Sequence, residues 1–514
     1  MRLRFLVTVM VLGAVRAVAG APQADSCRDL TQLKIESVEI SSAKLIPSGP
    51  MSMGMPPGST SSAIFPAYCR VDGVINRRKG VGGEEFGIGF ALALPDKWNG
   101  DFMMQGGGGG NGFIQPPLGA AFAGNTPGLA RGFAVASTDT GHKAKSGAFD
   151  FSFMRDQQAY LDFAYVANAE VAGVVKQIIA RYYAKPAAYS YFVGCSTGGR
   201  EGMILSQRYP TVFNGIVSGD PAMRTGLSNL AISQWIPVAF NQAAPKDPAG
   251  KPMIDQLFTD NDRKLFADAL LKQCDAKDGV ADGIISDPLG CDFDPAVLAC
   301  KEAESASCVA PEKVAAIKKA FAGPKNSRGV QVYPGFLYDT GVTQTAMIPG
   351  LLSPRSAGLF GPYPTATELD VDRAALHASD PLVEPASTNL STFSGNGGKL
   401  IFFHGASDPW FSALDTLNYY KSLAGSSGGA DKVAQWSQIY LVPGMSHCGG
   451  GPALDQFDML SAVVDWVEKG RTPQSVIATG KAFPGRSRPL CPYPQHAQYK
   501  GSGSIEDAGN FECK

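Results

Sequence analysis

The sequence has little net charge, one long apolar run at its start, and no cysteine pair of the CxxC type. Among 514 residues, lysine and arginine number 45 and aspartate and glutamate 46, which gives a formal net charge of -1. A chain without a basic excess is not expected to bind nucleic acid or an anionic membrane surface. The missing CxxC pairs argue against zinc ribbons and thioredoxin-like redox chemistry. No long stretch is poor enough in apolar residues to predict disorder.

The apolar run belongs to the N-terminus, MRLRFLVTVMVLGAVRAVAGAPQ, which has the pattern of a secretory signal. Basic residues precede the apolar stretch at 5–15, and small residues follow at 17–21. A membrane anchor is the alternative, but the run is interrupted by an arginine and is shorter than the roughly 20 residues that span a bilayer. We predict a signal peptide over residues 1–21, no membrane-spanning segment, and a secreted or periplasmic protein.

Short apolar runs that end in glycine or a small polar residue predict buried strands. They lie at 132–138, 189–194, 215–219, 399–405 and 438–444. Residues 86–94 also predict a strand, because their apolar side chains alternate with the period of a strand. Helical patterns separate them, such as 160–183 and 458–470. Strands that alternate with helices indicate an α/β protein with a largely parallel sheet.

The alternation of strands and helices breaks in one long internal stretch. Residues 223–385 are rich in proline, serine and glycine. We interpret this stretch as an inserted lid domain that covers the loop edge of the sheet. The main domain is then expected to comprise residues 22–222 and 386–514.

A glycine-rich turn between a predicted strand and a predicted helix carries the clearest chemical signal. Its sequence, GCSTG at 194–198, fits G-x-S-x-G. Such a turn presents the serine hydroxyl, here of Ser196, at the carboxyl end of the strand, and the N–H of Thr197 then faces the place where a tetrahedral oxyanion forms. The alternative is a turn whose serine only caps the helix. With a strand before it and a helix after it, we expect Ser196 to be a nucleophile.

A serine nucleophile needs a base and an acid that orients the base. His447 follows a late predicted strand in a glycine-flanked loop, and Asp408 follows an earlier strand, which is the order of acid and base expected after such a turn. His404 competes as the base, but its place at a strand end also suits a buried histidine bonded to backbone. The remaining histidines, for which we expect a structural role or find no motif, are His142, His377 and His496.

Each of the two reactive residues has a cysteine beside it. Cys195 precedes the serine and Cys448 follows the histidine. If the hydroxyl and the imidazole are within hydrogen-bond reach, the cysteines are close as well, and a disulfide with Cα atoms about 5.5–6 Å apart would fix the base beside the nucleophile. The alternative, Cys195 as the nucleophile, fits poorly with an exported protein that has a matching cysteine.

The segment QGGGGGNG at 105–112 follows an early predicted strand. Glycine lets backbone N–H groups approach a ligand closely, so this loop is expected to supply the second oxyanion donor. A phosphate-binding loop is one alternative, but the ending GKS or GKT of a P-loop is missing. A plain flexible loop is the other.

Several longer segments carry a resemblance to a known family. They are LPDKWNGDFMMQGGGGGNG, SYFVGCSTGGREGMILSQRYP, CDAKDGVADGI, HGASDPWFSALDT, LVPGMSHCGGGP and RPLCPYPQHAQYKGSG. The sequence resembles the tannase/feruloyl esterase family, which implies an α/β-hydrolase fold with a lid and the activity of a carboxylic ester hydrolase. The resemblance implies Ser196 as nucleophile, His447 as base, Asp408 as orienting acid, and the N–H groups of Gly109 and Thr197 as oxyanion hole. It also implies five disulfides, Cys27–Cys69, Cys195–Cys448, Cys274–Cys291, Cys300–Cys308 and Cys491–Cys513.

The segment CDAKDGVADGIISDPLGC at 274–291 spaces aspartates and glycines closely. Hard cations bind several oxygens, and glycine lets a short segment wrap around an ion. The terminal glutamate of an EF-hand is missing, and a solvated acidic turn is the alternative. The resemblance implies a structural calcium ion held by the side chains of Asp275, Asp278 and Asp282 and the carbonyls of Val280 and Ile284.

The resemblance predicts the type of reaction more narrowly than it predicts the substrate. The family acts on esters of aromatic acids, namely feruloyl and related cinnamoyl esters, galloyl esters and, in one branch, terephthalate half-esters. The lid segment 341–376 departs from the family pattern, because it is short and has no tryptophan. The arginine that binds the free carboxylate in the terephthalate branch has no aligned counterpart here. Arg355 is a candidate, with an ordinary solvated arginine as the alternative.

We therefore predict a secreted serine esterase that acts on small aromatic esters or on plant polysaccharide or polyphenol esters of hydroxycinnamic or gallic acid. A terephthalate half-ester hydrolase is the first alternative. The others are a secreted acyltransferase with the same three residues and a non-catalytic binding protein.

Overall fold

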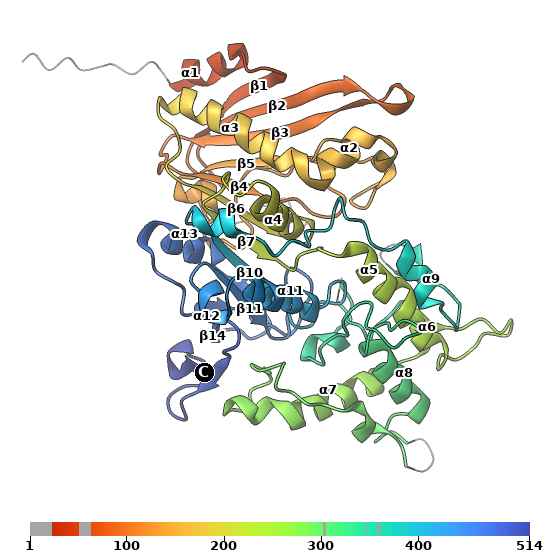
Figure 1. The fold of residues 1–514 in the computed structure, drawn as a ribbon. Coiled ribbons are helices and arrows are strands. Elements are labelled where there is room, and N and C mark those ends of the chain that lie inside the picture. Colours follow the sequence, from red (N-terminus) through yellow and green to blue (C-terminus); the bar gives the residue numbers. More distant parts are fainter. Residues whose placement is uncertain (1–22, 51–62, 302–304, 347, 356, 359–360) are drawn as a thin grey trace, which may run out of the picture.

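A computed structural model describes residues 23–50, 63–301, 305–346, 348–355, 357–358 and 361–514. The predicted signal peptide, residues 1–21, lies outside the described residues. A nine-stranded sheet runs through the molecule in the order β1-β2-β3-β5-β4-β6-β7-β10-β11 (Figure 1). Its strands are β1 (Val38–Ile46), β2 (Tyr68–Lys79), β3 (Glu85–Pro95), β4 (Phe102–Gln105), β5 (Ala134–Thr138), β6 (Ser190–Cys195), β7 (Gly215–Gly219), β10 (Lys399–Gly405) and β11 (Ser437–Val442).

The sheet is parallel from β5 to β11, whereas β1, β2, β3 and β5 pair antiparallel. This confirms the predicted α/β fold with a mostly parallel sheet. Strands β1 and β2 were not predicted from the sequence. Positions in β1 are partly buried or exposed, and those in most of β2 are buried or partly buried. Charged or polar side chains interrupt the apolar ones in both strands, so neither forms a continuous apolar run.

Helices cover both faces of the sheet, because successive strand residues point to opposite sides. On β4, Phe102 and Met104 pack in one hydrophobic cluster with helices α3 (Ala167–Tyr183), α4 (Thr197–Arg208) and α11 (Ala413–Ser426). Met103 faces the other cluster, which contains the buried residues of α13 (Met459–Lys469). Burial on both faces explains why the central strands are almost purely apolar.

The helix predicted over 160–183 is not continuous. It begins as α2 (Gln157–Leu161), passes through a π-helical turn, η5 (Asp162–Val166), and continues as α3. A π turn takes one more residue per turn than an α-helix, and periodicity in the sequence does not reveal it.

The segment between β7 and β10 forms a separate helical layer at the end of the molecule opposite β1 (Figure 1). Its elements are α5 (Thr225–Leu230), the π turn η6 (Ala231–Trp235), α6 (Ile236–Asn241), α7 (Asp260–Cys274), α8 (Pro311–Phe321), β8 (Ala357–Gly358), β9 (Gly361–Pro362) and α9 (Val371–Leu376). Helix α10 (Ser391–Gly395) follows them and packs on the main domain, where Phe393 belongs to the same hydrophobic cluster as Phe102. A hydrophobic cluster of its own, from Ala231 to Leu352, holds this layer together. The cluster falls within the predicted lid, whose boundaries stay a prediction.

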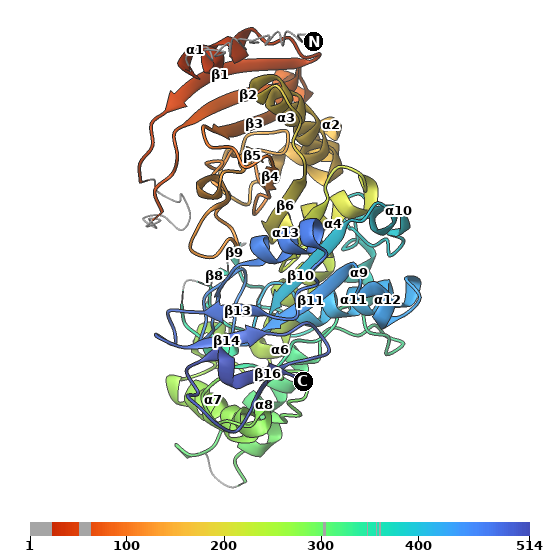
Figure 2. The same ribbon diagram turned by 90° about the vertical axis from the view of Figure 1, so that its left-hand side faces the viewer.

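The C-terminal segment returns to this helical layer and lies beside α7 in both views (Figures 1 and 2). It contains β12 (Gln456–Phe457), β13 (Val476–Thr479), β14 (Ser487–Leu490), β15 (Ala497–Tyr499) and β16 (Phe511–Cys513). The remaining short helices are α1 (Gln23–Asp29) and α12 (Ala430–Val433).

Five disulfides join all ten cysteines: Cys27–Cys69, Cys195–Cys448, Cys274–Cys291, Cys300–Cys308 and Cys491–Cys513. These are the pairs that the resemblance implied. Across the described part of the chain, no helix combines the length and the apolar character that a bilayer span requires.

Candidate active site

The turn that carries Ser196 connects β6 to α4 and has an unusual backbone. Ser196 has φ 63° and ψ -124°, a backbone conformation that residues other than glycine rarely adopt. A Cβ atom on Gly194 would lie 2.6 Å from the backbone of Gly198, so the glycines of the motif let the strand and the helix approach closely. The Ser196 N–H donates to the Gly219 carbonyl at 3.0 Å, which ties the turn to the end of β7.

His447 and Asp408 meet from two different loops. His447 Nδ1 lies 2.7 Å from Asp408 Oδ2, and both side chains are buried. The other carboxylate oxygen accepts the N–H groups of Trp410 and Phe411 at 2.8 and 3.1 Å. Burial alone would raise the pKa of Asp408, but the nearby His447 and His404 lower it below its usual value. Asp408 is therefore held as a carboxylate that can orient the imidazole.

A disulfide brings the loop of His447 to the serine turn. Cys195 and Cys448 are bonded, with Cα atoms 6.1 Å apart, so Cys195 has no free thiol. The His447 ring packs 4.5 Å, between centroids, from Trp410, which lines the same cavity as Ser196. Within the described residues, no hydrogen bond joins Ser196 Oγ to His447 Nε2. Such bonds are often long before a substrate binds and tighten in the substrate complex.

A buried carboxylate that sequence reasoning missed holds these loops in place. Asp220 follows β7 and accepts the N–H groups of Gly405, at 2.7 Å, and Cys448, at 3.0 Å. Burial, together with the charge of Asp408, raises the pKa of Asp220. The end of β10 and the loop of the imidazole are thus attached to one side chain. No sequence motif marks Asp220, so this role could not be predicted from the sequence.

His404, the competing base, lies within this buried network. Its side chain is fully buried, Nδ1 lies 2.9 Å from Thr416 Oγ1, and Nε2 lies 3.0 Å from the Phe411 carbonyl. The second contact is the bond to backbone expected of a buried histidine. His142 is also buried and stacks on Phe153 at 3.5 Å between ring centroids.

The glycine-rich loop and the start of α4 face the same cavity as Ser196. Gly109 has φ 60°, and a Cβ atom there would lie 2.3 Å from the Ala148 carbonyl oxygen, so this position requires glycine. The Thr197 hydroxyl donates to the Gly109 carbonyl, which connects the loop to the helix. Thr197 is the first residue of α4, and its N–H has no partner within the helix.

A second buried carboxylate anchors the glycine-rich loop from behind. Glu201, on α4, accepts the Gly107 N–H at 3.1 Å and the Asn111 side-chain amide at 2.6 Å. Burial raises the pKa of Glu201. These bonds hold both ends of the stretch that contains Gly109. Asn111 and Glu201 are 90 residues apart in the chain, so only the folded structure reveals the contact.

The cavity beside Ser196 has a volume of about 390 Å³, which suits a small organic ligand. Aromatic side chains form much of its wall: Phe149, Phe151, Phe163, Trp410 and Phe411. Its one charged lining residue among those described is Arg200, whose guanidinium donates to the carbonyls of Ala164, at 2.8 Å, and Phe163, at 3.1 Å. The cavity therefore fits an aromatic group better than an anionic one.

The family model for tannase and feruloyl esterase matches residues 69–358 and 363–514. The chain belongs to the tannase and feruloyl esterase family. It is accordingly a carboxylic ester hydrolase, as predicted.

Relatives within the family differ in their named substrates. The chain is 38% identical to a mono(2-hydroxyethyl) terephthalate hydrolase of Piscinibacter sakaiensis, over 89% of this chain and 86% of that protein. It is 29% identical to a probable feruloyl esterase of Arthroderma benhamiae, over 82% and 81%. The crystal structure of feruloyl esterase B from Aspergillus oryzae superposes with a TM-score of 0.78 at 25% identity, covering 96% of this chain and all of that one.

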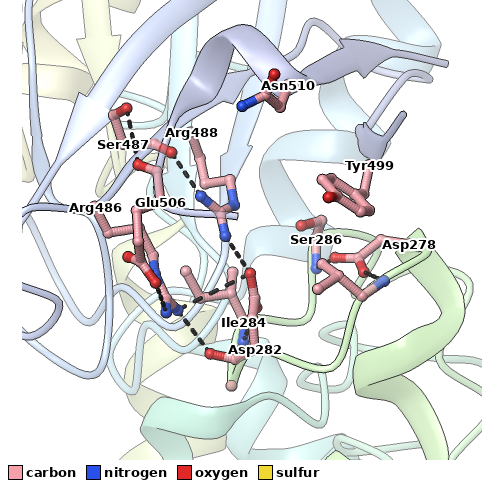
Figure 3. Close-up of polar contacts among 12 residues, drawn as sticks. Asp278, Asp282, Ile284, Ser286, Arg486, Ser487, Arg488, Tyr499, Glu506 and Asn510 are labelled. Atoms are coloured by element: carbon pink, nitrogen blue, oxygen red, sulfur yellow. Dashed lines mark hydrogen bonds and ion pairs between the residues drawn. The ribbon is translucent and has the colours of Figure 1, made fainter. Parts of the chain in front are cut away.

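The aspartate-rich loop of this esterase packs against the C-terminal segment (Figure 3). Asp282 forms an ion pair with Arg488, and Arg486 donates to the Asp282 carbonyl at 2.7 Å. Asp275 and Asp278 are buried and accept backbone N–H groups of the same loop. Burial raises the pKa of Asp278 to about 6.

Whether this loop suits a calcium ion depends on its oxygen atoms. The loop has three carboxylates within eight residues, and two of them are buried without a cationic partner among the described residues. A divalent cation would neutralise such a donor set. The side-chain oxygens of these three aspartates do not converge, however. Among the described residues, two groups of acidic, histidine or cysteine side chains bring their ligand atoms within 4.8 Å of one another, and both groups lie near Asp220 instead. Calcium binding would thus require the carboxylates to turn toward a common centre.

Arg355, the candidate for a substrate carboxylate, does not line the cavity of Ser196. It lies at a neighbouring cavity of about 280 Å³ and donates to the Thr345 carbonyl at 3.0 Å. Its side chain is exposed, as the solvated alternative predicts.

Proposed function

We propose that this esterase hydrolyses esters of hydroxycinnamic or gallic acid through Ser196, His447 and Asp408. The observation that carries the proposal is the arrangement around the Cys195–Cys448 bond. A carboxylate 2.7 Å away orients the imidazole, and the disulfide ties the loop of the imidazole to the serine turn, which lines an aromatic cavity.

The proposed reaction follows from this geometry. Ser196 Oγ attacks the ester carbonyl carbon while His447 Nε2 takes the hydroxyl proton, and Asp408 stabilises the imidazolium. When the tetrahedral intermediate collapses, the bond to the alkoxy oxygen breaks, and His447 returns the proton to the leaving alcohol. His447 then takes a proton from a water molecule, whose oxygen attacks the acyl carbon. The bond between this carbon and Ser196 Oγ breaks, His447 returns the proton to Oγ, and the free acid leaves.

The negative charge of the tetrahedral intermediate needs hydrogen-bond donors. We propose the N–H groups of Gly109 and Thr197, which line the cavity with Ser196. Removal of one such donor costs about 2.7–4 kcal/mol of transition-state stabilisation in a well-studied protease. Both donors here are backbone groups, and the contact between the Thr197 hydroxyl and the Gly109 carbonyl fixes their relative position.

The lining of the cavity, whose one charged residue among those described is already bonded to backbone, supports a phenolic acid over a terephthalate half-ester. A terephthalate half-ester carries a free carboxylate, and burying an unpaired carboxylate is costly. Arg200 is already bonded to backbone carbonyls, and Arg355 lies at the neighbouring cavity. The terephthalate half-ester stays the second candidate because of the 38% identical relative.

Initial rates on methyl ferulate, methyl gallate, mono(2-hydroxyethyl) terephthalate and p-nitrophenyl acetate test this ranking. We expect turnover of a phenolic ester above the terephthalate half-ester. Turnover of the half-ester with none of the phenolic esters would reverse it. A fluorophosphonate probe should label the wild type and not Ser196→Ala, whereas labelling of that variant would exclude Ser196 as the nucleophile.

Acyl transfer in place of hydrolysis is tested in the same reactions with added alcohol. A serine acyl-enzyme can be intercepted by an alcohol instead of water. An acyltransferase would yield mainly the new ester when methanol or glycerol is present in moderate excess, whereas the proposed hydrolase yields mainly the free acid.

We further propose a structural calcium ion at Asp275, Asp278 and Asp282 and the carbonyls of Val280 and Ile284, and export from the cell. Five disulfides support export, because such bonds persist in oxidising compartments. Mass spectrometry of the protein from the culture medium and the periplasm would locate both the protein and the predicted cleavage after residue 21.

A further inference from the structure

The cavity beside Ser196 contains a polar stripe that the proposed mechanism does not use. Thr225, Asn229 and Ser233 line it at intervals of four residues along α5 and η6. Residues four apart lie on one face of a helix, about 6 Å apart along its axis. The helix thus presents a row of polar side chains to a cavity whose other walls are mainly apolar.

Two of these side chains have no hydrogen-bond partner in the part of the chain that the structure describes. The Thr225 hydroxyl donates to the Ala222 carbonyl at 2.8 Å. Among the residues that the structure describes, nothing forms a hydrogen bond with the Asn229 amide or the Ser233 hydroxyl. Both residues are half-buried. Polar groups in such surroundings are normally paired with protein, water or ligand, so these two are available to a bound molecule.

The local helix geometry is also unusual at this cavity. Ser233 lies in the π turn η6, and Phe163, on another wall, lies in the π turn η5. π turns are rare and occur often at functional sites, because the additional residue changes which side chains face inward. Both π turns of this structure that lie in described segments supply residues to the one cavity.

We propose that Asn229 and Ser233 bind the ring hydroxyl of the acyl group and so select esters of phenolic acids. The proposal rests on the proposed function, because the acyl group stays bonded to Ser196 in the acyl-enzyme and must occupy the cavity that adjoins this residue. A phenol donates one hydrogen bond and accepts others, and an amide with a neighbouring hydroxyl can satisfy both roles. A ring without the hydroxyl would leave these groups unpaired, which is the strongest basis for rejecting an analogue.

The test compares two esters that differ by one hydroxyl, methyl 4-hydroxycinnamate and methyl cinnamate. The measured quantity is the ratio of their kcat/KM values. Loss of one neutral hydrogen bond corresponds to roughly a three- to tenfold change. We expect Asn229→Leu, of similar volume, and Ser233→Ala each to lower the ratio by that factor through slower turnover of the hydroxylated ester. Gln234→Ala, an exposed neighbour on the same turn, is the matched control and should keep the wild-type ratio.

The outcomes are separable. A wild-type ratio in both variants would overturn the proposal, and so would equal losses on both esters, which indicate a packing role only.

A second pair, 4-hydroxyphenethyl acetate and phenethyl acetate, places the ring in the alcohol. If the variants change this second ratio and not the first, the acyl assignment is wrong. Thermal melts verify folding, and Ser233→Ala, the smaller change, decides if Asn229→Leu does not fold. Failure of the proposed function differs from all of these, since Ser196→Ala would then retain hydrolysis.

Discussion

Removing the disulfide beside the active site should reduce both stability and turnover, and the two effects can be separated. Replacing Cys195 and Cys448 by alanine opens a loop of 253 residues. In the chain-entropy account, a disulfide that closes such a loop contributes about 5.5 kcal/mol to the free energy of unfolding. The two short disulfides within the loop shorten it only slightly, and the contribution depends on the logarithm of loop length, so they change this figure little. For a chain of this size, with an unfolding entropy of about 2 cal/mol/K per residue, the melting temperature should fall by about 5 °C.

The matched control is the removal of Cys300 and Cys308. Their disulfide closes a loop of only 8 residues in the helical layer. The same account gives about 2.5 kcal/mol, or about 2 °C. At 25 °C, where both variants are folded, p-nitrophenyl acetate turnover should be unchanged in the control. Without the Cys195–Cys448 bond, kcat should fall by more than about tenfold, because a misplacement of about 1 Å at a catalytic group costs up to a factor of about 100.

Two results would refute this reasoning. If the variant without Cys195 and Cys448 melts lower but keeps its kcat, the disulfide stabilises the fold without positioning the imidazole. If its kcat falls no more than that of the control, the loop of His447 is held by other contacts alone, of which the Cys448 N–H bond to Asp220 is the first to test.

Three further predictions concern other buried groups. Burial raises the pKa of Asp139 to about 7, above its value of about 3.9 in the unfolded chain, so ionisation costs stability as the pH rises from about 4 to about 7. Asp139→Asn keeps the acceptor for the Gly89 and Gly141 N–H groups. Its free energy of unfolding, measured in urea melts, should rise relative to that of the wild type by about 2–3 kcal/mol as the pH goes from 5 to 8. A difference that stays constant with pH would contradict this. In Glu201→Ala, the fold decrease in kcat for p-nitrophenyl acetate should exceed the fold change in KM by a factor of about ten, because the loop of Gly109 loses its anchor. Glu201→Gln should restore part of the lost kcat. An equal effect of both variants would indicate a purely structural role. A strong chelator should lower the melting temperature, with one calcium per chain found by elemental analysis; an unchanged melt and no bound metal would remove the calcium site.

Local sequence rules predicted the strand, turn and helix around Ser196. The strand before it is apolar, the glycines at 194 and 198 are needed for close backbone approach, and these requirements involve neighbours in the chain. The order of Asp408 and His447 after predicted strands also placed them at one edge of a parallel sheet, since the carboxyl ends of such strands meet there.

The supporting groups could not be predicted in this way. Asp220 and Glu201 bond to backbone N–H groups of distant segments, and a single aspartate or glutamate in a sequence gives no sign of burial. Strands β1 and β2, at one end of the sheet, lack continuous apolar runs. The π turn at 162–166 leaves helical periodicity almost unchanged.

By itself, the sequence determined the fold class, the turn that carries Ser196 and, through its resemblance, the disulfide pairs and the family. Those features depend on periodicity and on short motifs, which are properties of neighbouring residues. Only the tertiary structure decided that Asn229 and Ser233 face the cavity, that Arg355 does not line it, and that Asp282 pairs with Arg488. These relations depend on where segments far apart in the chain pack together, which sets the burial, the partners and the charge of each side chain.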